Sequence, residues 1–167
     1  MYLVPFIAAI HVKETQSSPL RRARPPIPNA RGDAAIHEQL GPAIEVERPQ
    51  AALEYAVRMS AGPSGTDADR WAAALLAVVL GDASGSRLYW ACVDGGEAEQ
   101  ASCQHHEFLD AGLFVTHLAC DAADVERLLE RILDVYRAAA AAGVDASELA
   151  QARNKLAGRI VLAGERP

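Results

Sequence analysis

The stretch Leu80–Leu88, with the sequence LGDASGSRL, separates two apolar segments by glycines and small polar residues. Gly81 occupies the position of a C′ glycine, and together with Gly85 it permits a tight turn. The apolar residues before this turn recur at helical spacing: Trp71, Ala74, Leu75, Val78 and Val79. We therefore expect a buried helix over 66–81, then the turn, then a short helix over 84–93.

Three segments around this turn have the pattern of strands. Residues 53–59 alternate apolar and other side chains, a period of two that predicts a strand with one buried face. The apolar members of this alternation are Leu53, Tyr55, Val57 and Met59. Residues 99–108 and 113–120 indicate two further strands, and the short connection through Gly112 favours a hairpin.

Two longer helices are expected after the hairpin. Asp121 can cap the first, and Gly143 ends it. Its apolar stripe consists of Val125, Leu128, Leu129, Ile132, Val135 and Tyr136. Asp145 and Glu148 form a capping-box pair at the start of the last helix. The order of elements predicts an α+β fold in which helices cover one face of a mostly antiparallel sheet.

The first part of the chain differs in character from the rest. Residues 1–42 are punctuated by proline, serine and glycine, and we expect an irregular N-terminal extension or linker there, followed by one domain over 43–167. Within the extension, Tyr2 to Ile10 is apolar enough for a strand or a buried arm, but too short to span a membrane.

Charge and cysteine content exclude several classes of function. The net charge is −6 and the sequence pI is about 5.3, so a basic face for nucleic acid is not expected. The only basic cluster, Arg21, Arg22 and Arg24, is interpreted as solvated linker. Three cysteines without a CxxC motif argue against a disulfide framework. We expect a soluble protein, cytoplasmic or periplasmic. The cysteine content does not decide between these compartments.

Four segments in order resemble one peptidase family. LGDASGSRL is similar to the "LGGG-x-SSRL" turn of the pitrilysin/insulinase (mitochondrial processing peptidase-like) metallopeptidases. Asp110–Val115 (DAGLFV) resembles their "D-x-G-x-F", Gly143–Leu149 (GVDASEL) their "G-V-T-x-x-E-L", and Ala152–Leu156 (ARNKL) their "A-K-x-x-L". The resemblance spans about 43–165. It implies a pitrilysin-like domain of the zinc-free second type, cut short at its C-terminus, because family domains continue with a further helix and an edge strand.

The resemblance also assigns roles to individual residues. Gly81, Ser86, Arg87 and Leu88 match the family's structural turn motif. The arginine and tyrosine that active members use to hold the peptide fall, by register, on Val93 and Gln100. Valine cannot donate a hydrogen bond and glutamine has no phenol, so the usual transition-state stabilisation is expected to be lost.

A zinc site is not expected in this chain. The family's metal motif is H-x-x-E-H, and none of the five histidines stands in it: His11, His37, His105, His106 and His117. Without ligands and a carboxylate base, no catalytic or metal-binding residue is predicted, no cofactor is expected, and zinc would belong to a partner subunit.

Other chemistry-bearing residues have a simpler interpretation. Cys103, His105, His117 and Cys120 can supply soft metal ligands from two neighbouring strands, but alternation places His117 and Cys120 on opposite faces. His105, His106 and Glu107 are interpreted as a solvated hairpin end. Trp71 and Trp90 are predicted to fill the core rather than line a pocket.

Three functional hypotheses remain open from the sequence. In the leading one, a non-catalytic domain associates with a homologous or zinc-bearing peptidase domain, or with a second copy of itself. In the alternative, the chain binds substrate in trans for an active zinc metalloendopeptidase. In the third, the hairpin holds a metal or ligand through Cys103 and His105.

Overall fold

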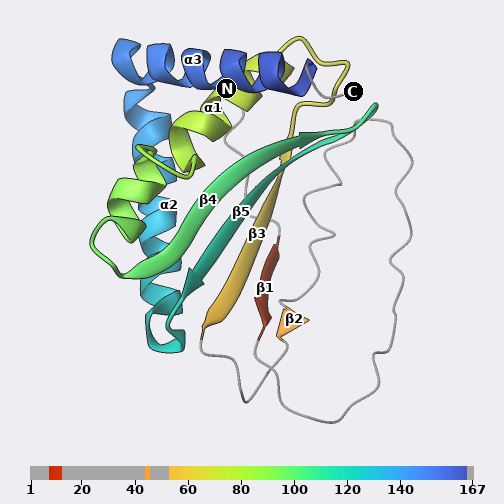
Figure 1. The fold of residues 1–167 in the computed structure, drawn as a ribbon. Coiled ribbons are helices and arrows are strands. Elements are labelled where there is room, and N and C mark those ends of the chain that lie inside the picture. Colours follow the sequence, from red (N-terminus) through yellow and green to blue (C-terminus); the bar gives the residue numbers. More distant parts are fainter. Residues whose placement is uncertain (1–7, 13–43, 46–52, 165–167) are drawn as a thin grey trace.

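The computed structural model describes residues 8–12, 44–45 and 53–164 (Figure 1). Strands β1 (Ala8–Val12), β2 (Ile44–Glu45), β3 (Glu54–Gly62), β4 (Ala98–Glu107) and β5 (Gly112–Cys120) form one sheet in the order β2-β1-β3-β5-β4. Every neighbouring pair is antiparallel except β1 with β2. The mostly antiparallel sheet predicted from the sequence is thereby confirmed.

The helices lie on one side of the sheet, as Figure 1 shows. They are α1 (Arg70–Gly81), α2 (Val125–Ala142) and α3 (Ala146–Gly164), with a π-helical turn η2 (Tyr89–Val93) and a 3₁₀ turn η3 (Ala122–Asp124). The core lies between helices and sheet, where Leu88, Leu118, Leu128 and Ile132 are almost completely buried. The α+β fold class is confirmed.

The buried face of β3 is not formed by the odd-numbered apolar residues whose alternation predicted the strand. Ala56 belongs to the main core cluster, whereas Tyr55 is 52% exposed. Since neighbours in a strand point to opposite faces, the even-numbered side chains of β3 meet the helices. The small Ala56 allows close packing there, while the larger side chains stand on the opposite face, an arrangement that alternation alone could not assign.

The helix ends follow the sequence in part. Gly143 ends α2 with a φ of 77°, the left-handed conformation that glycine adopts without strain. The Asp145 carboxylate accepts hydrogen bonds from the amides of Ser147 and Glu148, and Glu148 accepts one from the Asp145 amide at 3.0 Å, which confirms the capping box. Asp121 makes no side-chain cap, because η3 intervenes before α2 begins.

The N-terminal residues contribute to the same sheet where they are described. β1 lies inside the segment expected to be irregular and pairs with β3 from Ala8↔Met59 to Val12↔Tyr55. Part of the apolar stretch Tyr2 to Ile10 is therefore in a strand, and its first residues lie outside the described part. The basic cluster of Arg21, Arg22 and Arg24 also lies outside it. The domain boundary between residues 42 and 43 stays a prediction.

Candidate functional site

The junction between α1, η2 and α3 contains the four residues of the turn motif. Gly81 is the last residue of α1, and it is glycine because the helix meets β4 there. A Cβ on Gly81 would lie 1.9 Å from the backbone nitrogen of Cys103. The C′ role expected from the sequence is therefore wrong: Gly81 has no positive φ, and close approach of helix and strand is what requires glycine.

Ser86 and Leu88 hold the turn against the core. The buried Ser86 hydroxyl donates to the Asp82 carbonyl at 2.7 Å and accepts from the Tyr89 amide at 3.2 Å. It thereby satisfies a carbonyl after α1 and an amide at the start of η2. Leu88 is completely buried in the main core cluster.

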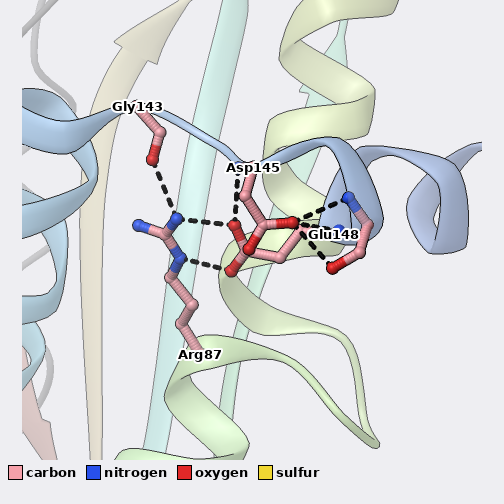
Figure 2. Close-up of polar contacts among 5 residues, drawn as sticks. Arg87, Gly143, Asp145 and Glu148 are labelled. Atoms are coloured by element: carbon pink, nitrogen blue, oxygen red, sulfur yellow. Dashed lines mark hydrogen bonds and ion pairs between the residues drawn. The ribbon is translucent and has the colours of Figure 1, made fainter.

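Arg87 joins this turn to the loop between α2 and α3 (Figure 2). Its Nε and Nη2 donate to the two carboxylate oxygens of Glu148, each at 2.7 Å, and Nη2 also donates to the Gly143 carbonyl at 2.8 Å. The hydrogen bond with Glu148 raises the pKa of Arg87 and lowers that of Glu148. This fork-to-fork pairing is specific to the planar guanidinium.

A second ionic centre lies beside it. The Asp82 carboxylate, at the end of α1, pairs with Lys155 at 2.7 Å and with Arg159, both from α3. Burial raises the pKa of Asp82, but hydrogen bonds from Lys155 and Arg159 outweigh burial and lower it. Sequence reasoning missed this centre, because Asp82 and Lys155 are 73 residues apart and neither stands in a recognisable pattern.

A third ionic centre fixes the start of β4. Glu97 pairs with Arg127 and Arg131 of α2, and Arg131 also donates to the Ala91 carbonyl at 2.9 Å. Hydrogen bonds from Arg131 and then Arg127 lower the pKa of Glu97 to about 2. Arg87, Asp82 and Glu97 thus each connect the turn region or the start of β4 to a helix that is distant in the chain.

Val93 and Gln100 are not brought together as a peptide-binding pair. Val93 is half-buried against the main core cluster at the end of η2. Gln100 is exposed at the start of β4, beside a β-bulge, and its amide donates to the Ser102 hydroxyl at 3.4 Å. Only the Gln100 side chain is therefore accessible to another molecule, and its substrate-binding role stays a prediction.

The proposed metal ligands of the hairpin do not converge. Cys103 and His105 pair across the ladder with Thr116 and Phe114, whereas His117 points to the opposite face, paired with Ser102. His105 Nε2 shares a hydrogen bond with the Pro63 carbonyl at 2.9 Å. Within residues 53–164, no three His, Cys, Asp or Glu side chains are grouped to hold a metal ion. This part of the chain does not fit zinc.

The cysteines and tryptophans occupy different environments. Cys92, Cys103 and Cys120 are buried free thiols, and burial raises the pKa of each. Trp71 and Trp90 are 50% and 62% exposed, so the prediction that they fill the core is wrong. Trp71 lies on the outer side of α1, under the Arg70 guanidinium at 4.6 Å, and Trp90 meets Tyr89 edge to face.

The comparison with models of known protein families gives one match. Residues 11–156 match the model of the family described as the Peptidase M16 inactive domain. The match covers most of the chain, so the chain belongs to this family, and the resemblance to the zinc-free pitrilysin-type domain is confirmed. No curated protein matches the chain.

Solved structures share the fold. The inactive peptidase domain of a protein described as a zinc protease, from Bordetella parapertussis, has a TM-score of 0.63 at 21% identity over 72% of this chain and 66% of that one. A peptidase M16 inactive domain from Pseudomonas fluorescens gives 0.61 at 23% identity over 74% of this chain. A protease from Helicobacter pylori gives 0.62 at 19% identity over 68%. The chain spans 66%, 35% and 28% of these three structures.

Among the residues that the structure describes, no helix is long and apolar enough to cross a membrane.

Proposed function

We propose that this chain is a non-catalytic member of the M16 group that acts by associating with a homologous or zinc-bearing peptidase subunit. The observation that carries the proposal is the family itself, which is that of inactive domains. The sequence also contains no H-x-x-E-H motif. A chain of this kind contributes through surfaces rather than through a metal-activated water.

The far end of α3 supports an associating role. After Leu156 every described residue of the helix is exposed, and Ile160, Val161 and Leu162 are 52%, 60% and 65% exposed. Consecutive helical residues point in directions about 100° apart, so these three cover much of the circumference. Neighbouring exposed apolar side chains of this kind are typical of a protein–protein contact.

The edge of the sheet offers a second contact. β4 is the last strand beside β5, and one row of its backbone groups has no strand partner in the described sheet. Such an edge can accept a strand from another chain.

The experiment is a co-purification. The tagged chain would be co-expressed with the product of a neighbouring reading frame that encodes H-x-x-E-H, and complex formation would be measured by light scattering after gel filtration. We expect a stable complex that Ile160→Ser with Leu162→Ser weakens at least about tenfold, since each loses buried apolar area. Val144→Ser, at an exposed position before the start of α3 and on neither proposed surface, is the matched control. A chain that stays monomeric and unbound would refute association.

The alternative function, substrate binding in trans, rests on the accessible amide of Gln100. If it holds, adding the chain raises the peptidase activity of the zinc-bearing subunit, and Gln100→Ala raises KM while complex formation stays intact. Under the leading proposal the substitution changes neither quantity.

A further inference from the structure

A cavity of about 310 Å³ lies between the sheet and helices α1 and α2. Its apolar wall is formed by Leu76 and Leu80 of α1, Phe114 of β5 and Leu133 of α2. The volume falls at the lower end of the range for small-molecule sites, and a mostly apolar lining is typical of them. None of the residues assigned to the turn motif or to peptide binding lines it.

The two guanidinium groups that line the cavity are both engaged within the protein. Arg137 donates to Asp134 at 2.8 Å and lies 4.0 Å from Glu130. Burial lowers the pKa of Arg58 to about 10, Glu130 acts against this shift, and Arg58 makes a further interaction within the chain. Because these cations have partners in the protein, they do not require a ligand to bring a negative charge.

Three neutral polar groups of the lining also interact with one another. The Thr116 and Tyr136 hydroxyls share a hydrogen bond of 2.6 Å. Burial raises the pKa of the Cys103 thiol, and its hydrogen bonds with Tyr136 and Thr116 lower it. Burial also raises the pKa of the Tyr136 phenol, so thiol and phenol both stay protonated at neutral pH. A ligand therefore meets no ionised group among these three side chains.

The cavity reaches the surface beside α2. Arg137 lines it, and the Arg137 side chain is 62% exposed. A small molecule can therefore enter at this point without separating α1 from the sheet. Entry from the surface and an apolar wall farther in together favour a ligand that is held by burial of its own apolar surface.

The volume sets the size of the ligand. An engineered apolar cavity of about 150 Å³ in another protein stays dry and binds benzene. The present cavity has about twice that volume, which leaves room for a second ring. Phe114 and Tyr136 place two aromatic side chains in its lining, and aromatic rings interact favourably with one another edge to face or in offset stacks.

We propose that this cavity binds an uncharged aromatic molecule of about two fused rings, packed against Leu80, Phe114 and Leu133. A carboxylate or an ammonium group would bring a further charge into a mostly apolar space, and its desolvation would weaken binding. The inference is independent of the association proposed above.

The first test uses the unaltered protein. Naphthalene, benzene and 2-naphthoate would be titrated into it, and the leucine methyl signals would be followed by NMR. We expect naphthalene to saturate one site per chain and to shift the methyl signals of Leu80 and Leu133. Benzene should bind about tenfold more weakly because it buries less apolar area, and 2-naphthoate at least about tenfold more weakly because its charge is desolvated. Absence of saturable shifts, or binding of either analogue as tight as that of naphthalene, would overturn the proposal.

Variants locate the site. Ala140 lines the cavity, and Ala138 is exposed on the same helix. Ala140→Phe should fill the cavity and abolish naphthalene binding, whereas Ala138→Phe should preserve it. Unchanged binding by a folded Ala140→Phe variant would overturn the proposal.

A second measurement decides the location if circular dichroism shows that Ala140→Phe unfolds. Nuclear Overhauser effects between naphthalene and the methyl groups of Leu80 and Leu133 in the unaltered protein would place the ligand in the cavity. Effects confined to the exposed Ile160 and Leu162 of α3 would instead show surface association and overturn the proposal.

Discussion

Arg87 binds both carboxylate oxygens of Glu148 although the two residues are 61 positions apart in the chain. Glu148 meanwhile completes the capping box of α3 with its hydrogen bond from the Asp145 amide. One carboxylate therefore starts α3 and attaches it to the turn after α1, as Figure 2 shows. This relationship explains physically why an arginine stands in the SRL segment: it connects the turn after α1 to the start of α3.

Removing either member of the pair should destabilise the fold. About three quarters of each side chain is buried, so Arg87→Ala and Glu148→Ala should each lower the free energy of unfolding by about 2 kcal/mol. Urea denaturation measures both. In the double variant the losses should be less than additive, because the second substitution removes a group that has already lost its partner. Arg137→Ala, which breaks exposed ion pairs, should cost about 0.5 kcal/mol or less. Fully additive losses would mean that the pair contributes nothing jointly.

Two glycines in helices should respond in opposite directions to alanine. Gly81→Ala forces a Cβ to within 1.9 Å of the Cys103 nitrogen, and we expect a loss of at least about 3 kcal/mol, since helix and strand must separate. Gly158→Ala meets nothing within 4 Å in α3 and should stabilise the protein by about 0.5–1 kcal/mol. Thermal unfolding of the two variants provides the comparison. Tolerance of Gly81→Ala would contradict the close contact of α1 with β4.

Stability should fall with acid in a way that depends on Glu97. Its pKa is depressed from 4.5 to about 2 in the folded state by Arg131 and Arg127. The contribution is therefore fully present above pH 4.5 and is lost as the pH falls towards 2. The free energy of unfolding, measured by urea denaturation at several pH values across this window, should depend less on pH for Glu97→Gln than for the unaltered protein. Arg131→Gln should show an intermediate dependence. Identical pH profiles for all three proteins would show that the pairing is not formed.

The fluorescence of both tryptophans should indicate that their side chains are exposed to water. Trp71 and Trp90 are at least half exposed, so the fluorescence of the native protein should lie close to that of tryptophan in water, with efficient quenching by iodide. The two tryptophans are the only ones in the chain, so Trp71→Phe and Trp90→Phe each leave a single reporter. A blue-shifted, protected emission from either would favour the core position that helical spacing predicted.

Local patterns predicted most elements because they depend on neighbours in the chain. The capping box at Asp145, the glycine that ends α2 and the hairpin through Gly112 need only adjacent backbone groups for their geometry. Patterns of burial were less reliable. The alternation in β3 marked a strand but named the wrong face, since Ala56 rather than Tyr55 meets the helices.

By itself, the sequence determined the α+β order of elements, the family and the lack of an H-x-x-E-H motif, because each depends on residue types at short spacing. The tertiary structure alone decided that Gly81 is required by Cys103, that Asp82 meets Lys155, and that Arg58 and Arg137 share a cavity. These contacts join residues at least 22 positions apart, between 81 and 103 at the shortest. Their geometry arises only when helices pack on the sheet, since no local preference encodes which distant side chains will meet.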